Sequence, residues 1–335
     1  MATVALACVT AYGVAATVGL AALAALGDRT VPTYAFGVLP WWSLGPAVVG
    51  LVMAAALRSR TATVTVLVPA VVWLWTFGPM LVPARGTPPD PDLTVATFNI
   101  SAEPGSDHVV AMIQRSDPDL VLVQEVLPGT RRRLETQLDA LGLLPHRHFS
   151  DVSRSAPGGG GTGVLSALPI TDVTAVDGLP DGARPTDVVT VDAGGVAVPV
   201  VSVHLTSPPT TQVLEGFADG SVRGLTVDRL GRRRVREALA LAAALPADDT
   251  LVVGGDLNSS WLNQPIAILG DVGLHDTHRA VGSGPGFTRG GRRDVARIDF
   301  VLLADGLTPV SSVEGLAGSS DHRPVIVEVS LPASA

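Results

Sequence analysis

The sequence 251-LVVGGDLNSS-260 reads as a short buried strand that ends in polar residues. Leu251 to Val253 are typical of such a strand, and the pair Gly254-Gly255 predicts its end. Asp256 and Asn258 then follow in the turn. A carboxylate can orient or deprotonate a water molecule, and an amide can donate a hydrogen bond to a phosphoryl oxygen. Because Asp and Asn are also common turn formers, this stretch alone leaves a purely structural role open.

Other predicted strand ends also carry polar residues that a hydrophobic core does not need. They are Asn99 in TFNI, Glu125 in VQEV, His204 in VSVHLTS, Asp299 in RIDFVLL, and Asp321-His322 in SSDHRPV. Each has an ordinary alternative: Glu125 could cap a turn, His204 could be a buried core imidazole, and Asp299 could pair with a nearby arginine. The recurrence of such strand ends favours a site over these separate explanations.

The candidate metal ligands among these residues are all oxygen donors. Glu125 and Asp321 are carboxylates, and Asn99 is their neutral neighbour. Such a set suits Mg²⁺ or Mn²⁺, and the sequence has no Cys/His cluster with the spacing of a zinc site. His322, next to a carboxylate, is suited to act as a base or as an imidazolium that contacts phosphate.

From Leu93 onward, short β-rich runs alternate with helical stretches. We expect helices at Asp107–Arg115, Arg131–Leu141 and Arg232–Leu245, and strands in the motifs quoted above. About 240 residues with this pattern are typical of one α/β domain with a large core. The four glycines at 158–161 predict a flexible loop and not a phosphate cradle, because no Lys-Ser/Thr pair and no helix follow them.

Residues 1–82 differ in composition, since they carry only four charges. They contain three uncharged segments of 23, 20 and 21 residues: Val4–Leu26, Val38–Leu57 and Ala62–Val82. About 20 apolar residues cross the hydrocarbon core of a bilayer, so the sequence predicts three transmembrane helices. A cleaved signal peptide is the alternative for the first, but it lacks a basic leading region. We therefore expect a membrane domain at 1–82, a stiff proline-rich linker at 83–92 and a catalytic domain at 93–335.

The arginines of the short connections predict the topology. Arg58-Ser59-Arg60 holds two arginines and no acid, whereas the first connection holds Arg29 beside Asp28. The positive-inside rule places the two-arginine loop and the N-terminus in the cytoplasm. The predicted protein is a multi-pass protein of the cell membrane with its catalytic domain on the extracytoplasmic side.

The ordered series TFNI, QEV, GVLS, VHL, GDLN, RIDFVLL and SDHRPV resembles the endonuclease/exonuclease/phosphatase superfamily. That superfamily includes DNase I-like nucleases, sphingomyelinases and inositol-phosphate phosphatases, and the resemblance covers about residues 93–332. It implies a four-layer α/β/β/α sandwich, two face-to-face sheets with helices outside, and a divalent-metal phosphoesterase. The layout is also similar to actinobacterial membrane proteins of this superfamily linked to teicoplanin resistance, although no diagnostic residue carries that narrower likeness.

The resemblance implies a role for each matched position. Glu125 matches the principal metal ligand, with Asn99 and Asp321 beside the metal. Asp256 matches the residue that orients the attacking water, and Asn258 matches the residue that contacts the phosphate. His322 matches the histidine at the scissile phosphate, and Asp299 matches the carboxylate that orients this histidine. His204 matches the nuclease and lipid-phosphatase branches and argues against abasic-site repair. Ser166 in GVLS and Arg297 before Asp299 are expected substrate contacts.

The charge of the catalytic region favours a lipid-linked phosphate or pyrophosphate over nucleic acid. Residues 93–335 hold 19 Arg against 28 Asp plus Glu, whereas a nuclease is expected to carry a basic groove. The predicted partners are therefore the bilayer and a phosphorylated substrate. A membrane-anchored extracellular nuclease and a non-catalytic binding module on the same fold remain alternatives, and no protein partner is inferred.

Overall fold

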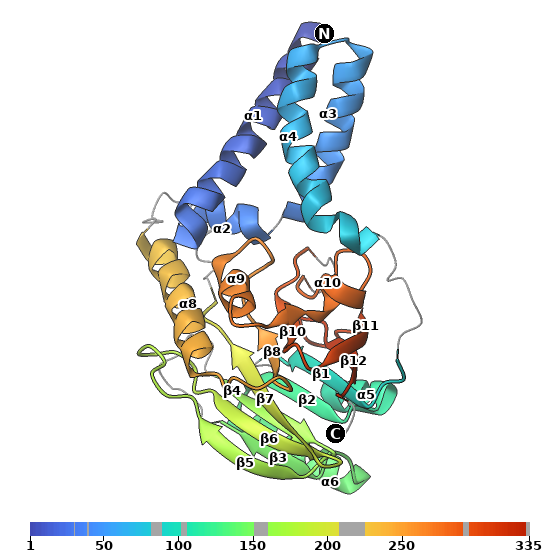
Figure 1. Cartoon of the computed structure of the whole chain (residues 1–335), viewed down its shortest axis with the longest axis vertical. Coiled ribbons are helices and arrows are strands. Elements are labelled where there is room, and N and C mark those ends of the chain that lie inside the picture. Colours follow the sequence, from blue (N-terminus) through green and yellow to red (C-terminus); the bar gives the residue numbers. More distant parts are fainter. Residues whose placement is uncertain are drawn as a thin grey trace.

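The computed structural model describes residues 1–29, 31–38, 40–81, 89–101, 106–150, 160–207, 225–290 and 295–332. An N-terminal helical unit (residues 1–81) stands at one end of a β-sandwich (residues 89–332) (Figure 1). Residues 82–88, which hold most of the predicted linker 83–92, lie outside the described residues.

The sandwich consists of two six-stranded sheets. The first has the order β11 (Thr308–Glu314), β12 (Val325–Ser330), β1 (Leu93–Asn99), β2 (Leu120–Val126), β4 (Gly161–Ser166) and β3 (His146–Phe149). The second has the order β5 (Ile170–Ala175), β6 (Asp187–Ala193), β7 (Val196–His204), β8 (Val252–Asp256), β10 (Asp299–Leu303) and β9 (His275–Asp276). The pairs β1–β2 and β7–β8 are parallel. Parallel strands bring their carboxyl ends to one edge, which is where the polar residues stand.

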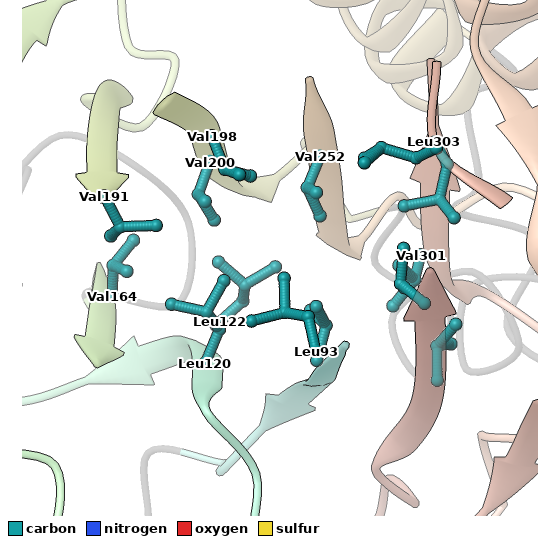
Figure 2. Close-up of a cluster of buried hydrophobic side chains, with 14 of the residues drawn as sticks. Leu93, Leu120, Leu122, Val164, Val191, Val198, Val200, Val252, Val301 and Leu303 are labelled. Atoms are coloured by element: carbon teal, nitrogen blue, oxygen red, sulfur yellow. The ribbon is translucent and has the colours of Figure 1, made fainter. Parts of the chain in front are cut away.

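Successive side chains of the central strands point to opposite faces of their sheet and so contribute to two different layers of the core. Leu120 and Leu122 of β2 point between the sheets and meet Val200 and Val252 of the opposite sheet (Figure 2). Their neighbours Val121 and Val123 belong instead to the core beneath the outer helices. Both faces of β2 are therefore buried, as expected for an apolar strand in the centre of a covered sheet. The predicted two-sheet sandwich is confirmed.

Helices cover both outer faces. The helices α5 (Asp107–Ser116) and α6 (Pro128–Leu141) pack on the first sheet, and α8 (Leu225–Ala244) and α9 (Gln264–Gly270) pack on the second. Helix α6 begins three residues earlier than the sequence predicts, because Pro128 occupies the first turn, where its missing N–H costs no hydrogen bond.

The pair Gly254-Gly255 lies inside a strand and does not end it. Strand β8 continues to Asp256, so the aspartate is its last residue and not part of the turn. A Cβ on Gly254 would lie 2.6 Å from Leu122 Cδ1, and one on Gly255 would overlap the carbonyl oxygen of Val203. The glycines are thus explained by close packing between and within the sheets.

Among the described residues of the N-terminal unit, two helices are long and apolar enough to cross a membrane. They are α1 (Ala2–Leu26, 25 residues) and α4 (Arg60–Phe77), which the turn Gly78–Leu81 extends to 22 residues. The expected span Val38–Leu57 differs, because α2 (Val31–Val38) ends and α3 (Leu44–Ala56) starts only after a 3-10 turn at Pro40–Ser43. Proline has no N–H to continue a helix, and α3 alone has only 13 residues.

The outward faces of these helices are apolar. Val52 is 64% exposed, Val68 45% and Trp75 82%. The inward faces carry small residues, among them Ala54 and Ala62, both fully buried. Small residues that let helices approach closely, with large apolar residues outside, are typical of helices packed in lipid.

Candidate active site

The polar strand ends predicted from the sequence meet at one edge of the sandwich. In the second sheet, Asp256 is the direct cross-strand partner of both His204 and Asp299. Asn99 and Glu125 reach the same place from β1 and β2 of the first sheet, and His322 precedes β12. All of these side chains except that of Glu125 are at least 95% buried.

Asn99 joins the two sheets through its side-chain amide. Its Nδ2 donates to Glu125 Oε1 at 3.2 Å and to Asp256 Oδ2 at 3.0 Å. Its Oδ1 accepts from the Ser101 N–H at 3.0 Å, which assigns the orientation of the amide. One neutral residue therefore holds two carboxylates near each other across the sandwich.

Two residues of the site adopt a left-handed backbone. Glu125 has a φ of 61° at a register shift of β2, and Asn258 has a φ of 46° after β8. Asparagine tolerates this conformation, whereas for glutamate it costs of order 1–3 kcal/mol. Gly160 faces the backbone of Glu125 so closely that a Cβ there would overlap it. The structure thus maintains a strained backbone that turns the Glu125 side chain toward the site.

Asp256 is a buried carboxylate among other charges. Its Oδ1 accepts the Asn258 N–H at 2.9 Å. Burial, reinforced by the negative charge of Asp299, raises the pKa of Asp256 to about 6, although His322 acts in the opposite direction. A carboxylate with this pKa is ionised at neutral pH and basic enough to orient or accept a proton from water.

His322 and Asp299 form a buried ion pair. His322 Nδ1 lies 2.9 Å from Asp299 Oδ2, and Asp299 is held by the Thr288 hydroxyl, which bonds its backbone N–H at 3.1 Å. Burial acts to lower the pKa of His322, but Asp299 and Asp256 outweigh it and raise that pKa to about 9. The ring is therefore an imidazolium at neutral pH, with Nε2 3.7 Å from Asp256 Oδ2.

Comparisons with known proteins identify the family of the chain and its fold. The sequence profile of the endonuclease/exonuclease/phosphatase family matches residues 96–322. The chain belongs to this family. Among curated proteins none matches the sequence. A member of the family from Beutenbergia cavernae has a similar solved structure, with 24% identity over 72% of each chain and a TM-score of 0.56.

Two further structures share the fold at lower identity. A family member from Bacteroides vulgatus is 18% identical, with 71% of this chain and 98% of that chain covered and a TM-score of 0.54. TDP2 of D. rerio, solved with a single-strand DNA product, is 15% identical over 71% of this chain and 98% of that one, with a TM-score of 0.52.

The family is mostly one of metal-dependent phosphoesterases and nucleases, and the residues present fit a divalent ion. Glu125 and Asp256 supply carboxylate oxygens on either side of the Asn99 amide. His204 Nε2 lies 3.5 Å from Asp256 Oδ2 and 3.9 Å from Glu125 Oε1, and neither of its ring nitrogens has a hydrogen-bond partner among the described residues. Burial lowers the pKa of His204 well below its usual value, with Arg184 adding to this effect. A buried neutral imidazole beside two carboxylates is suited to a metal, its water or a phosphoryl group.

Asp256, Asp299 and His322 also lie close enough together to hold an ion. We favour the Glu125 side instead, because His322 is protonated and its Nδ1 is bound to Asp299. Asp321, a predicted metal ligand, is half exposed and paired with Arg289 at 2.7 Å. It lies 3.9 Å from His322 Nε2, so the structure places it beside the imidazolium.

The structure does not bring the two predicted substrate contacts to this cluster. The guanidinium of Arg297 is buried, binds both oxygens of Asp276 at 2.6 Å and is covered by the Phe300 ring at 4.0 Å. Ser166 lies at the opposite end of β4, opposite Leu120, where its hydroxyl donates to the Leu168 carbonyl. Both side chains are held by contacts within the fold, the Arg297 Nη atoms by Asp276 and the Ser166 hydroxyl by Leu168.

Two arginines outside the quoted motifs also belong to the site. Arg184, between β5 and β6, is buried, and its Nη1 lies 3.4 Å from the His204 carbonyl oxygen. Its charge acts on Glu125 and Asp256. Arg289 contacts His322 Nε2 as well as Asp321. Arg184 is a single arginine in a loop and carries no pattern, so only the folded chain reveals it, whereas Arg289 begins the basic stretch 289–297 just before Asp299, which could be expected to reach an anionic substrate.

Metal removal tests the ligand assignment. We expect EDTA to abolish turnover and Mg²⁺ or Mn²⁺ to restore it, because the proposed ligands are chiefly oxygens. Glu125→Gln should raise the Mg²⁺ concentration needed for half-maximal activity at least tenfold, measured by metal titration. Undiminished activity in EDTA would contradict the assignment.

Proposed function

We propose that this protein is a membrane-held, metal-dependent phosphohydrolase that acts on a lipid-linked phosphate or pyrophosphate. The observation that carries the catalytic part is the juxtaposition of an ionised Asp256 and an imidazolium at His322, 3.7 Å apart. Asp256 orients the attacking water, and His322 stabilises negative charge on the phosphoryl oxygens. A bound Mg²⁺ or Mn²⁺ would supply further charge stabilisation.

The position of the site supports a substrate that arrives from a bilayer. The loop after β8 carries Asn258 on one side, and its Trp261 packs on Phe77 of α4 with ring centroids 5.6 Å apart. Trp42 stacks on Phe287 at 5.4 Å and donates to the Val295 carbonyl at 2.8 Å. Aromatic residues such as these are enriched where a membrane protein meets the interface. The catalytic edge therefore adjoins the end of the apolar helices.

We infer three spans, with α3 as the shortest, and an extracytoplasmic sandwich. The N-terminus and the connection between α3 and α4 lie at the end of the helical unit far from the sandwich (Figure 1). That connection contains Arg58 and is followed by Arg60. By the positive-inside rule, the end of the helical unit far from the sandwich then faces the cytoplasm. A role in glycopeptide resistance stays a prediction.

A reporter fusion tests this topology. A reporter that is active only outside the cell should be active when fused after Ala335 and inactive when inserted at Arg58–Thr61. The reverse pattern would place the site in the cytoplasm and would favour intracellular substrates.

A membrane-anchored nuclease is the second candidate. It is favoured by His204 and by the fold shared with TDP2, which was solved with a DNA product. The excess of acidic residues in 93–335 opposes it, since phosphate contacts dominate nucleic-acid affinity. A non-catalytic role fits less well, because Glu125, Asp256 and His322 are all present and held in place.

The purified full chain, assayed with Mg²⁺ in lipid nanodiscs, tests the proposal against its alternatives. We expect phosphate release from a polyprenyl pyrophosphate to exceed turnover of phospholipid and of plasmid DNA by at least tenfold in kcat/KM. Preferred cleavage of DNA would replace the proposal with the nuclease, and no turnover of any substrate would favour the binding module.

A further inference from the structure

Asp28 is a buried carboxylate at the junction between the N-terminal helical unit and the sandwich. It follows α1, and its side chain is 0% exposed. Its Oδ1 accepts from Asn263 Nδ2 at 2.7 Å, and its Oδ2 accepts from Arg234 Nη2 at 3.5 Å. Its backbone N–H donates to Gln264 Oε1 at 3.4 Å. A buried carboxylate is tolerated only when it is paired and hydrogen-bonded, so these contacts specify one docked arrangement.

Glycines allow the two units to approach this closely. A Cβ on Gly27 would overlap the Gln264 amide, and one on Gly37 would overlap Asn263 Nδ2. On the side of the sandwich, a Cβ on Gly231 of α8 would overlap the Asp28 carbonyl oxygen. Three close approaches around one carboxylate indicate a fitted interface and not an incidental contact.

The docked helix α2 carries Tyr34 to the catalytic edge. Its hydroxyl donates to the Asn258 carbonyl at 3.5 Å, and Asn258 in turn donates its N–H to Asp256. The Tyr34 ring covers the guanidinium of Arg234 at 4.6 Å. Arg234 therefore links Asp28 to Tyr34, with a counter-charge on one side and an aromatic face on the other.

The hydroxyl of Tyr34 is suited to donate and not to ionise. Burial raises the pKa of Tyr34 to about 12; Arg234 opposes this effect and Asp256 adds to it. The charge of Arg289, which contacts His322, also acts on it. Tyr34 thus keeps its proton at physiological pH, and the charges of Asp256 and of two arginines act on it.

We propose that the N-terminal helical unit completes the catalytic site: Asp28 anchors α2 on the sandwich, and the anchored helix places the Tyr34 hydroxyl where it exchanges its long hydrogen bond to the Asn258 main-chain carbonyl for one to a phosphoryl oxygen bound beside Asn258. Asp28 is then a positioning residue, and Tyr34 a residue of the phosphate subsite. The inference rests on the proposed function only in requiring that this edge binds a phosphoryl group.

Binding of inorganic phosphate to the full chain in nanodiscs with Mg²⁺, measured by calorimetry, tests the proposal. Tyr34→Phe keeps the ring over Arg234 and removes only the hydroxyl. We expect it to weaken phosphate binding about tenfold, as for one hydrogen bond to a charged group. Tyr12→Phe is the matched control, because Tyr12 is the other tyrosine of the chain and its hydroxyl donates to Ser43, within the helical unit. It should leave phosphate binding unchanged.

Amide hydrogen exchange separates the anchor from the subsite. Asp28→Ala should weaken phosphate binding as much as Tyr34→Phe does and should also speed exchange at residues 260–264, where Asn263 and Gln264 meet Asp28. Tyr34→Phe should leave that exchange unchanged, and the double variant should lose no more affinity than either single one.

Several outcomes would overturn the proposal: wild-type affinity in Tyr34→Phe, additive losses in the double variant, or no phosphate binding by the wild type. If the two variants behave as expected while polyprenyl pyrophosphate is not hydrolysed, the proposed substrate is wrong, and the phosphate subsite formed by the helical unit and the sandwich stands.

Discussion

The Asp256→Asn variant is expected to lose at least 10²–10⁴-fold in kcat with little change in KM. Asparagine keeps the volume of aspartate and removes the charge that orients the attacking water. The lost interaction acts in the transition state, so binding of the ground state should be largely retained. Steady-state kinetics on the preferred substrate, with saturating Mg²⁺, measure both quantities.

Stability should not follow activity in this variant. Burial and the negative charge of Asp299 raise the pKa of Asp256 to about 6 against the effect of His322, a net cost of order 3 kcal/mol for the ionised form that asparagine avoids. In the opposite direction, the two oxygens of Asp256 accept hydrogen bonds from Asn99 Nδ2 and from the Asn258 N–H, and the asparagine amide has only one oxygen. The loss of one of these hydrogen bonds costs about 1–3 kcal/mol. We therefore expect the melting temperature in EDTA to hold or to rise slightly.

The alternative of a structural turn residue predicts a different result. Asparagine forms such turns as readily as aspartate, so activity would survive. A fully active Asp256→Asn enzyme would leave the motif series as a marker of the fold alone. Asp276→Asn serves as the control, because Asp276 is a buried carboxylate that pairs with Arg297. This substitution should lower the melting temperature and have little effect on kcat.

Local patterns were enough for the sandwich but not for its details. The apolar run around Leu122 correctly predicted a strand, and the structure buries this strand on both faces. The strand Ile170–Ala175 was missed because its residues are mostly exposed and polar. The pair Gly254-Gly255 was interpreted as a strand end because contacts with Leu122 and Val203 are not visible in the sequence.

The candidate site was predictable where residues stand at strand ends. Asn99, Asp256 and His322 follow from motif order, and the structure brings them together with Glu125. Arg297 was expected to bind substrate because it lies two residues before Asp299, yet its guanidinium pairs with the buried carboxylate of Asp276. Tyr34 is 224 residues from Asn258 in the chain, and no local signal connects two such distant positions.

The alkaline limb of the pH profile should reflect the pKa of His322. Activity that needs the imidazolium should fall as the pH rises through about 9. Asp299→Asn removes the neighbour that raises this pKa most among the charges, so the limb should move to lower pH, with kcat reduced at pH 8 more than at pH 6. His322→Gln should lose the limb together with roughly 10²–10⁴-fold of the activity.

The stability of the folded protein should also fall as the pH rises through the pKa of His322. The folded-state pKa of His322 lies above the unfolded value, so the ion pair contributes fully below about pH 6.5, and the contribution is lost as the pH rises through about 9. The melting temperature of the wild type in EDTA should therefore decline between these values, and that of Asp299→Asn should decline less.

A second variant predicts a shift in the opposite direction. Arg289 lies against His322 Nε2, and its positive charge lowers the pKa of that ring. Arg289→Gln should therefore move the alkaline limb to higher pH, whatever it does to the absolute rate. Because both substitutions remove a charge beside His322, non-specific damage would shift the limb in the same direction or not at all. Opposite shifts from Asp299→Asn and Arg289→Gln would identify His322 as the titrating group, whereas identical shifts would assign the limb to another residue.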